Sequence, residues 1–534
     1  MMLSDQHTDV LIIGAGPSGL MMVAQLLRCG VRAVIIDSKK GPTDKTKALA
    51  VQARSMEIYR QMGIVDEVLK GGRPSRGLRF FFDGNEQGTF PITDSGAGLT
   101  PYPYLFMYPQ SRNEKDMLNY LTQNALPVYW NTTLTELQQD SAKVITKLTN
   151  GESVITVTAD WVVGADGAHS FVRKSLGSSF KGDTYQHKFY LADVVSDKSD
   201  DTVSLYFNNR SFAAFFPSPD KDSYRIIGAL PKELEDKPDI RLEDLTPVIE
   251  KIKGSPTVVK RNNWFTIYKL SHRMADKFQE GRCFLIGDAA HIHSPVGGQG
   301  MNTGLQDAYN LAWKLGGVIN GSLMRVILSS YAAERMPVAK TLLKTTDRLF
   351  NITMSTSWGA QLFKRFLMPP LLKTLWSFSG FTKALFMRVS QIGISYRDSK
   401  INLHLSQATH IKAGDRLPYL KIYDEKKQIE TDLHAWCTKA GFTMIVMGTI
   451  GEQELHRYAK WITQSFGAVL NFFYLPYSTR NDGVFNAFEI KAGHIKTLII
   501  RPDNYIGLIA DSADLGIVNN YLINTALINS KSTV

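Results

Sequence analysis

The sequence contains few cysteines, and their spacing excludes the usual cysteine-built structures. Only three occur in 534 residues, Cys29, Cys283 and Cys437, and no two form a CxxC pair. An odd number of widely separated cysteines argues against a disulfide framework and against a zinc cluster. The same pattern is typical of proteins kept in a reducing compartment, so we predict a cytoplasmic location.

Long apolar runs and clusters of one charge are also missing. No uninterrupted apolar stretch approaches the roughly 18 residues of a transmembrane helix. The N-terminal apolar run is short, is broken by glycine and has no basic region before it, which disfavours a secretory signal. The formal charge is +11, which makes the surface mildly attractive to anions such as a phosphorylated cofactor. Because the basic residues form no long run, nucleic acid is not an expected partner.

A glycine-rich turn lies near the N-terminus, between an expected strand and an expected helix. It reads GAGPSG at residues 14–19, and the next expected strand ends in Asp37. In a unit of this kind, Gly14 allows the tight turn, Gly16 lets a pyrophosphate approach the backbone and Gly19 lets helix and strand pack closely. A carboxylate at the end of the second strand can accept a hydrogen bond from a ribose hydroxyl. The unit therefore predicts dinucleotide binding.

Two other parts of the chain have the two-residue periodicity of strands. Turn signals such as Asp83-Gly84 separate their apolar runs. These parts interrupt segments that read as a nucleotide-binding α/β core, so two domains woven through one another are expected. We predict a β-rich domain from residues 76–107 and 184–275, within a nucleotide-binding α/β domain from residues 1–75, 108–183 and 276–345.

The rest of the chain divides into a helical segment and a C-terminal domain. Residues 346–404 are expected to be mainly helical, and residues 405–534 alternate strand and helix patterns over a length that suits an independent domain. The stretch at 351–387 is rich in Met and Phe. It fits contact with a membrane or a greasy substrate, or else helix packing, and packing is the favoured interpretation.

A second glycine-rich stretch, GDAAHIHSPVGGQGMN at residues 287–302, raises the possibility of a metal or a cofactor. His291 and His293 are two residues apart, a spacing that places them poorly for one metal ion, so no metal site is predicted. The run before them is expected to be a buried strand that ends in Asp288, and a helix is expected to begin near Thr303. A carboxylate beside a helix N-terminus suits a hydroxylated chain and a developing anion.

Several motifs occur in a fixed order along the chain. They are GAGPSG with Asp37, GADGAHSFVR at 164–173, and GRCFLIGDAAHIHSPVGGQGMNTGLQDAYNLAWKL at 281–315, with shorter matches at Pro109-Gln110, YAAERMPVA (331–339) and SQIGISY (390–396). Together they resemble the single-component flavin-dependent aromatic hydroxylases, a family that includes para-hydroxybenzoate hydroxylase, phenol hydroxylase and the polyketide hydroxylases. The resemblance covers almost the whole chain.

The resemblance implies a fold that is both α/β and α+β. A Rossmann-like FAD-binding domain would be interwoven with a β-sheet substrate domain, and a thioredoxin-like domain would follow at the C-terminus. Because that last domain has no CxxC pair, redox activity is not expected in it.

The resemblance also implies which residues hold FAD. The pyrophosphate would lie on the glycine turn, the adenosine ribose on Asp37 and the ribityl chain on Asp288, while backbone N–H groups after Pro295 would stabilise charge on the reduced ring. The pair Asp166-Gly167, called the DG pair below, is implicated in both FAD and NAD(P)H binding. The implied set is Gly14, Gly16, Pro17, Ser18, Gly19, Asp37, Lys47, Arg54, Gln110, Val128, Asp166, Gly167, Asp288, Pro295, Gly300, Met301 and Asn302.

Two positions depart from the pattern of the family. Lys47 stands where relatives usually carry arginine, although Arg54 is near, and His169 stands where the DG motif usually has arginine. Lysine keeps the charge but loses the planar fork, so its contact with a phosphate is expected to change. For Arg173, a contact on the cofactor side and an ordinary surface ion pair both stay open. His291 is expected to be structural, and no catalytic side chain is assigned.

The implied reaction is the hydroxylation of a phenolic or polycyclic aromatic substrate. In this family NAD(P)H reduces FAD, O₂ then adds to form a flavin C4a-hydroperoxide, and one oxygen atom passes to the substrate. Two alternatives remain: an antibiotic-modifying, and thus antibiotic-resistance, monooxygenase of tetracycline- or rifamycin-like polyketides, and a flavin-binding sensor without hydroxylase activity. A halogenase is disfavoured because no WxWxI element occurs. The choice between NADH and NADPH and the oligomeric state stay open, with a homodimer as one option.

Overall fold

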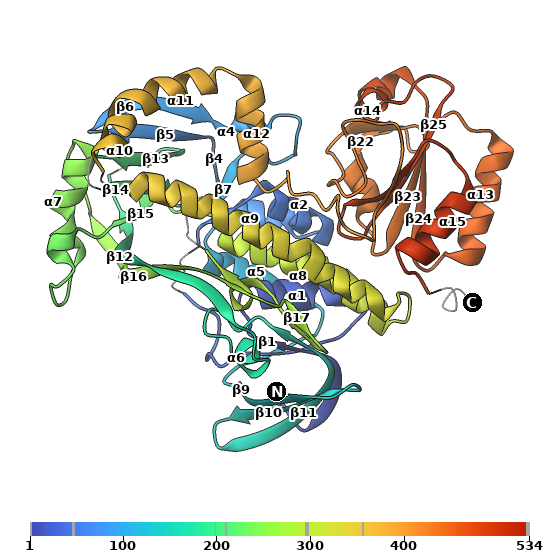
Figure 1. Ribbon diagram of the computed structural model, residues 1–534, viewed down its shortest axis with the longest axis horizontal. Helices are drawn as coiled ribbons and strands as arrows, with labels where there is room; N and C mark the ends of the chain where they lie inside the picture. Colours follow the sequence, from blue (N-terminus) through green and yellow to red (C-terminus); the bar gives the residue numbers. More distant parts are fainter. Residues whose placement is uncertain are drawn as a thin grey trace.

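Three larger sheets organise the described part of the chain, each with helices packed against it (Figure 1). The structure is a computed structural model, and it describes residues 3–44, 48–197, 199–208, 211–293, 298–354 and 357–529. The long helix α9 (Ser329–Met354) crosses the molecule, and the C-terminal sheet lies to one side of it.

The first sheet has parallel strands at its centre, and these central strands are buried. Strands β11, β1, β2 and β8 run parallel, and β18 extends the sheet beside β11. A strand buried on both faces is expected to be apolar throughout, which is the case from Val10 to Ile13. The strands are β1 (Gln6–Ile13), β2 (Val34–Ile36), β8 (Val128–Tyr129), β9 (Thr133–Gln139), β10 (Val144–Asn150), β11 (Ser153–Gly164), β17 (Gln279–Glu280) and β18 (Cys283–Leu285).

The helix α8 (Gly300–Ile319) packs beside α1 (Pro17–Arg28) and is buried along most of its length. It begins at Gly300 and not near Thr303, so the prediction of its start was late by three residues. Gly300, Met301 and Asn302 therefore lie in its first turn and not in the loop before it. The same domain contains α2 (Ala53–Met62), α3 (Val65–Gly71), α5 (Gln110–Gln123), α6 (Phe171–Ser175) and a small sheet of β3 (Ala50–Val51), β4 (Arg73–Ser75) and β7 (Leu105–Met107).

The second sheet is mainly antiparallel and has the strand order β19-β16-β12-β15-β14-β13-β5-β6. The expected turn at Asp83-Gly84 joins β5 to β6, and both residues have positive φ angles, 47° and 79°, as such a hairpin requires. Its elements are β5 (Gly77–Phe82), β6 (Asn85–Pro91), α4 (Ile92–Gly96), β12 (Phe180–Val195), β13 (Thr202–Phe207), β14 (Phe212–Pro217), β15 (Ser223–Ala229), α7 (Leu242–Lys253), β16 (Arg261–Ala275) and β19 (His291–Ile292).

The helix α9 is continuous through the domain boundary that was predicted at residues 345–346. The predicted boundary thus falls inside a helix, and the domain bounds stay predictions. Beyond α9, the helices α10 (Trp358–Leu362), α11 (Met368–Trp376) and α12 (Ser379–Val389) form an arch over β5 and β6 (Figure 1). Among the described residues, no helix is both long enough and apolar enough to cross a bilayer.

The C-terminal sheet has the strand order β20-β26-β25-β23-β24, and its thioredoxin-like assignment stays a prediction. Cys437 is buried there, and burial raises the pKa of its thiol to about 12, so the thiol is protonated at neutral pH. The elements are β20 (Leu403–Leu405), β21 (Lys421–Asp424), β22 (Ile429–Asp432), β23 (Phe442–Gly448), α13 (Glu452–Ser465), β24 (Leu470–Pro476), α14 (Asp482–Ala487), β25 (Ile495–Ile500), β26 (Ile506–Ala510) and α15 (Leu515–Asn520).

A buried group of charges joins the C-terminal domain to α8 and α9. The Arg501 guanidinium lies 2.7 Å from Glu334 and 2.6 Å from Asp503, and Lys314 lies 2.7 Å from Glu334. All four side chains are essentially inaccessible to solvent. Burial alone would raise the pKa of Glu334, but Arg501 and Lys314 outweigh it and hold that pKa well below its usual range. The carboxylate is therefore ionised and shared between two cations.

Replacing this carboxylate should weaken the docking of the C-terminal domain. Glu334→Gln leaves Lys314 and part of Arg501 buried without a compensating charge, which costs about 3–5 kcal/mol in comparable cases. We expect the C-terminal domain to unfold at a clearly lower midpoint urea concentration, which is measured by following the fluorescence of that domain. The control is Glu454→Gln, in an exposed pair with Arg457 at 2.9 Å, where a change of at most about 1 kcal/mol is expected. Equal, small effects of both variants would contradict the assigned role.

Candidate active site

The glycine-rich turn between β1 and α1 is closed on the side that faces the protein. A Cβ atom on Gly19 would lie 1.9 Å from the carbonyl oxygen of Gly14, and one on Gly14 would lie 2.4 Å from the carbonyl oxygen of Ala165. Gly14 also has a φ of 106°, which favours glycine. At Gly16, by contrast, no atom lies within 4 Å of the Cβ position. The turn is thus open where a pyrophosphate would approach.

No side chain caps the N-terminus of α1, and Pro17 occupies its first position. The backbone N–H groups of a helix start carry a partial positive charge and bind anions such as phosphate. Because Gly16 immediately precedes this helix, the open part of the turn and the positive helix end face the same space. This combination fits the pyrophosphate of a dinucleotide cofactor.

Asp37 lies directly beside the glycine turn. Its carboxylate accepts hydrogen bonds from the N–H of Ala15 at 2.7 Å and from the N–H of Lys39 at 2.8 Å. The neighbouring strand β8 pairs with β2 in a register that sets Val128 opposite Ile35. Val128 and Asp37 therefore flank the same end of the sheet, next to the turn.

Gln110 begins α5, and its side chain is held by a carboxyl group that the sequence did not single out. The Gln110 amide donates to Glu114 at 2.8 Å, and the Glu114 carboxylate also accepts from the Thr43 N–H at 3.4 Å. Burial raises the pKa of Glu114, and the charge of Asp37 adds to this shift. Through Glu114, Gln110 is therefore linked to the surroundings of Asp37.

The DG pair forms the turn that leads into α6. The Asp166 carboxylate accepts from the Ser170 hydroxyl at 2.6 Å and from the Phe171 N–H at 2.7 Å, so it caps the start of this helix. Gly167 has a φ of 76°, in the left-handed region. The pair thus shapes the turn, and burial raises the pKa of Asp166.

Arg173 connects the DG turn to the second glycine-rich stretch. It donates to the carbonyl oxygens of Ala289 and Ala168, each at 2.8 Å, and its guanidinium lies 3.7 Å from the centre of the Phe180 ring. Both hydrogen-bond acceptors are backbone groups, and no surface ion pair is among these three contacts. Arg173 therefore positions the turn at Gly287–Ala289, which carries Asp288.

Three segments far apart in the sequence meet at Ser18. A Cβ atom on Gly287 or on Gly304 would lie 2.3 Å from the Ser18 hydroxyl oxygen, so both residues must be small. Gly287 opens the turn Gly287–Ala289, in which Asp288 is exposed, and Gly304 lies one turn into α8. The first glycine motif, the Asp288 turn and the start of α8 are thereby brought into direct contact.

Asp307 holds this junction together. Its carboxylate accepts from the Gly287 N–H at 3.1 Å, lies 2.7 Å from His291 Nε2 and accepts from Arg335 Nε at 2.7 Å. Burial alone would raise the pKa of Asp307, but Arg335 and His291 outweigh burial and lower it to about 2. His291 thus contacts a structural carboxylate, in agreement with the structural role expected for it. Asp307 and Arg335 were missed as individual residues, although both lie within the motifs that carried the resemblance.

The first turn of α8 is fixed by the side chain of Asn302. Its amide oxygen accepts from the Gln52 N–H and the Ser55 hydroxyl, both at 2.8 Å, and its nitrogen donates to the carbonyls of Ala50 and Gly298, both at 2.9 Å. The side chain is fully buried, so only the backbone near it can face a ligand. No side chain caps this helix, and its positive end therefore remains available to an anionic group.

Two residues of the implied cofactor set are not described, and a third, Arg54, has other partners. Lys47 and Pro295 fall outside the described residues. The guanidinium of Arg54 is buried, donates to Glu57 at 3.0 Å and to the Asp503 carbonyl at 2.7 Å, and so faces the C-terminal domain. Because its charge is already paired there, Arg54 is removed from the proposed cofactor contacts.

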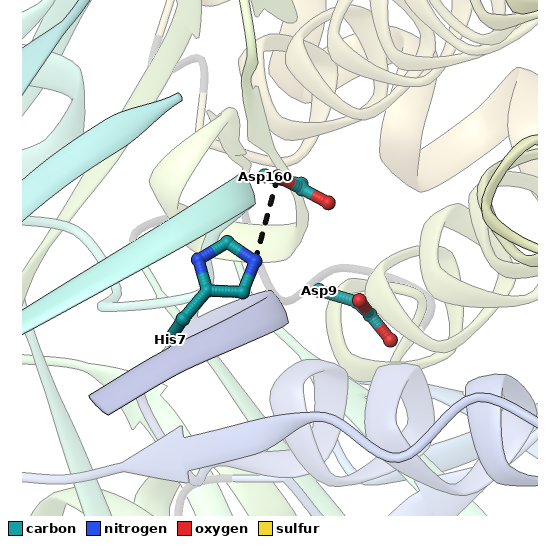
Figure 2. A group of neighbouring side chains, drawn as sticks. All are labelled: His7, Asp9 and Asp160. Atoms are coloured by element: carbon teal, nitrogen blue, oxygen red, sulfur yellow. Dashed lines mark ion pairs between the residues drawn. The ribbon is translucent and has the colours of Figure 1, made fainter. Parts of the chain in front are cut away.

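One group of metal-ligand type side chains lies close together within the described residues. His7, Asp9 and Asp160 place one ligand atom each within 4.8 Å of one another, and Figure 2 shows the His7 ring directed at Asp160, 3.6 Å away. His7 and Asp9 are exposed and lie on β1, and the C-terminal end of this strand leads into the glycine turn. The group is separate from the junction at Ser18, and the absence of a metal cofactor stays a prediction.

Comparison with known proteins now identifies the family. A family model described as an FAD binding domain matches residues 7–346. Pentachlorophenol 4-monooxygenase from Sphingobium chlorophenolicum is 31% identical over 422 residues, which are 77% of this chain and 75% of that protein. The chain belongs to the FAD-dependent aromatic monooxygenases. The predicted family and its cofactor, FAD, are thus confirmed, and NAD(P)H is the co-substrate typical of this family.

Two further similarities extend this result. The 6-methylpretetramide 4-monooxygenase of Streptomyces rimosus is 37% identical over 340 residues, 63% of this chain, and the chain covers 61% of that protein's length. The solved structure of OxyS anhydrotetracycline hydroxylase from Streptomyces rimosus superposes with a TM-score of 0.78 at 26% identity, over 97% of this chain and 99% of that one. The mixed α/β fold of this monooxygenase is therefore confirmed along nearly its whole length.

The close contact at Ser18 can be tested in the monooxygenase by a pair of variants. Gly304→Ala places a methyl group 2.3 Å from the Ser18 oxygen, and overpacking of this kind costs about 1–3 kcal/mol. We expect FAD to bind about tenfold more weakly, since about 1.4 kcal/mol corresponds to tenfold. Adding Ser18→Ala should restore most of the affinity, measured by fluorescence titration of the apoprotein.

The control is Gly380→Ala in α12, where no atom lies within 4 Å of the Cβ position and no change in FAD affinity is expected. If Gly304→Ala bound FAD as tightly as the unmodified protein, Ser18 would not be the meeting point of the three segments. Failure of Ser18→Ala to relieve the loss would show that the clash lies elsewhere.

Proposed function

We propose that this monooxygenase uses FAD, NAD(P)H and O₂ to hydroxylate a phenolic or polycyclic aromatic compound. The observation that carries the proposal is the junction at Ser18, where Gly287 and Gly304 approach the first glycine motif. A flavin dinucleotide is long and has a phosphate centre, a hydroxylated ribityl chain and a ring that becomes anionic on reduction. At the junction, the glycine turn, the Asp288 turn and the start of α8 lie side by side, and they suit the phosphates, the ribityl chain and the ring in that order.

The residues of this chain would bind and orient the cofactor. The open position at Gly16 and the N-terminus of α1 would face the pyrophosphate, and Asp37 would accept from the adenosine ribose. Asp288 would accept from ribityl hydroxyls, and the N–H groups at Gly300 and Met301 would lie toward the anionic edge of the reduced ring. When bound, the flavin supplies the redox chemistry that activates O₂.

Other residues of the implied set would shape the site around the cofactor. Gln110 and Val128 would line the adenosine side, and the DG pair, Asp166 and Gly167, would hold the turn against which Arg173 fixes Ala289. Asn302 would act through its backbone, because its side chain is used to fix the start of α8. A homodimer, the absence of nucleic acid partners and a cytoplasmic location stay predictions.

A second candidate function is the modification of tetracycline- or rifamycin-like antibiotics. Two of the similar proteins are named for pretetramide and anhydrotetracycline oxidation, and one is named for a chlorinated phenol. These names divide between the two substrate classes, so similarity alone does not favour the antibiotic. Phenols and fused polyketide rings share an electron-rich aromatic carbon, which is the feature that the proposed chemistry requires.

The proposed function can be tested with purified protein and a panel of substrates. Phenols, naphthoquinols and tetracycline- and rifamycin-type compounds should be added singly with NADH or NADPH, while NAD(P)H oxidation and O₂ uptake are followed. We expect at least one compound to accelerate both and to yield a product heavier by one oxygen atom in mass spectrometry. If FAD bound but no compound accelerated its reduction, the sensor interpretation would replace the enzyme.

The assigned ribityl contact can be tested at Asp288. Asp288→Ala removes a charged acceptor, and hydrogen bonds to charged groups contribute about 1.5–3 kcal/mol, so the Kd for FAD should rise at least about tenfold. The measurement is flavin retention during gel filtration together with a titration of the apoprotein. Asp160→Ala, in the separate group with His7 and Asp9, is the control and should retain FAD fully. Full flavin occupancy in Asp288→Ala would refute the contact.

A further inference from the structure

The helical arch of residues 357–389 exposes an unusual number of large apolar side chains. Of the seventeen such side chains exposed among the described residues, eight lie in these few turns. Trp358 is 79% exposed, and Phe366 and Phe378 are each about 60% exposed. Helix packing, the favoured interpretation of this stretch, therefore does not account for its outer surface. The eight side chains are Trp358, Leu362, Phe363, Phe366, Leu367, Leu371, Phe378 and Met387.

The inner surface of the arch packs firmly against the second sheet and α4. This packing determines which surface of the arch faces outward. The Trp376 ring lies 5.1 Å from Phe80 and 6.2 Å from Phe90, and a Cβ atom on Gly88 would lie 2.7 Å from it. Farther along, Phe386 is buried against α4. Figure 1 shows the arch lying over the second sheet, and these aromatic contacts anchor it there. The exposed apolar side chains are those that this attachment leaves outside.

The charges of the arch are of one sign. Between Asp347 and Asp398 the sequence has no carboxylate, yet it has seven basic residues. Elsewhere the protein mixes both signs, since the whole chain has 61 basic and 50 acidic residues. Arg365, Lys373 and Lys383 are exposed beside the apolar side chains. A surface that combines exposed aromatic residues with basic residues alone matches the boundary between lipid tails and anionic headgroups.

We propose that the arch, residues 357–389, is a docking surface for an anionic lipid bilayer. Its helices lie along the bilayer surface, the aromatic and aliphatic side chains enter the headgroup boundary, and the basic residues contact lipid phosphates. The attachment is peripheral. A second copy of the chain fits this surface less well, because a two-fold contact of the arch with itself would oppose basic residues to basic residues.

The arch also borders a cavity that reaches the start of α8. The cavity has a volume of about 720 Å³, and Leu385, Met387 and Arg388 of α12 line it together with Gln299. Gln299 directly precedes α8 and donates to the Val389 carbonyl at 3.3 Å. A bilayer bound at the arch would therefore lie next to a route toward the cofactor. This consequence, the supply of an apolar aromatic substrate from the bilayer, rests on the proposed function, whereas the docking itself does not.

The docking surface can be tested by sedimenting the full-length, FAD-loaded protein with vesicles. We expect binding to vesicles of phosphatidylcholine with phosphatidylglycerol, little binding to phosphatidylcholine alone, and weaker binding at high salt because charges at the surface are screened. The triple variant W358S/F366S/F378S and the double variant R365E/K373E should each lower the partition coefficient at least about tenfold. All of these residues are exposed, so retention of FAD and of the far-UV spectrum is expected.

The matched control is V154S/V326S/I429S, which removes three apolar side chains of similar exposure outside the arch and should bind vesicles like the unmodified protein. The proposal is overturned if the protein binds to none of the vesicles, or if both arch variants bind to the vesicles as well as the control does. It is also overturned if the arch instead mediates dimerisation, seen as a dimer that the triple variant converts to a monomer. Because vesicle binding needs no turnover, loss of the proposed function would leave this result unchanged.

Discussion

The ionised carboxylate of Asp307 is the group on which the arrangement of the site depends. It is fully buried, and it exists as an anion because Arg335, His291 and the Gly287 N–H surround it. These three partners come from α9, from β19 and from the turn before it. A buried charge is tolerated only when its partners are all in place, so Asp307 fixes three segments with respect to α8 at once. The position of Asp288 beside Ser18 follows from that constraint.

The helix α9 extends the same principle to the C-terminal domain. Glu334 and Arg335 are adjacent in the sequence, and neighbouring residues on a helix point about 100° apart. Arg335 therefore faces Asp307 and the cofactor junction, while Glu334 faces Lys314 and Arg501. Two buried charge groups that face different directions thus share one turn of α9. Through this turn, the C-terminal domain and the flavin junction rest on the same helix, although they lie in different sheets.

The outer parts of the molecule obey a different constraint. The arch of residues 357–389 is anchored by Trp376 and Phe386, which cover the second sheet, and its remaining apolar residues face outward. A helix that is apolar on more than one side has to cover something on each side. One side covers β5 and β6 (Figure 1), and the absence of carboxylates on the other side points to an anionic partner. The arch thus differs from the junction, where the buried Asp307 has its counter-charges, Arg335 and His291, within the protein.

The sequence by itself determined the features that depend on near neighbours. The turn GAGPSG, the strand that ends in Asp37 and the hairpin at Asp83-Gly84 could be predicted, because backbone sterics and short spacing decide them. The long motif at 281–315 was sufficient to predict the family, since many residues in fixed order leave few alternative folds. The interweaving of the two sheets also followed from the alternation of periods along the chain.

Only the tertiary structure decided how individual side chains are used. Arg54 is paired toward the C-terminal domain, the amide of Asn302 is taken up by Gln52, Ser55 and Ala50, and α8 begins at Gly300. Likewise, an apolar stretch rich in Met and Phe has the same composition whether its outer face is covered or exposed. Hydrogen-bond partners and burial are set by segments hundreds of residues away, and these contacts leave no periodic signal in the local sequence.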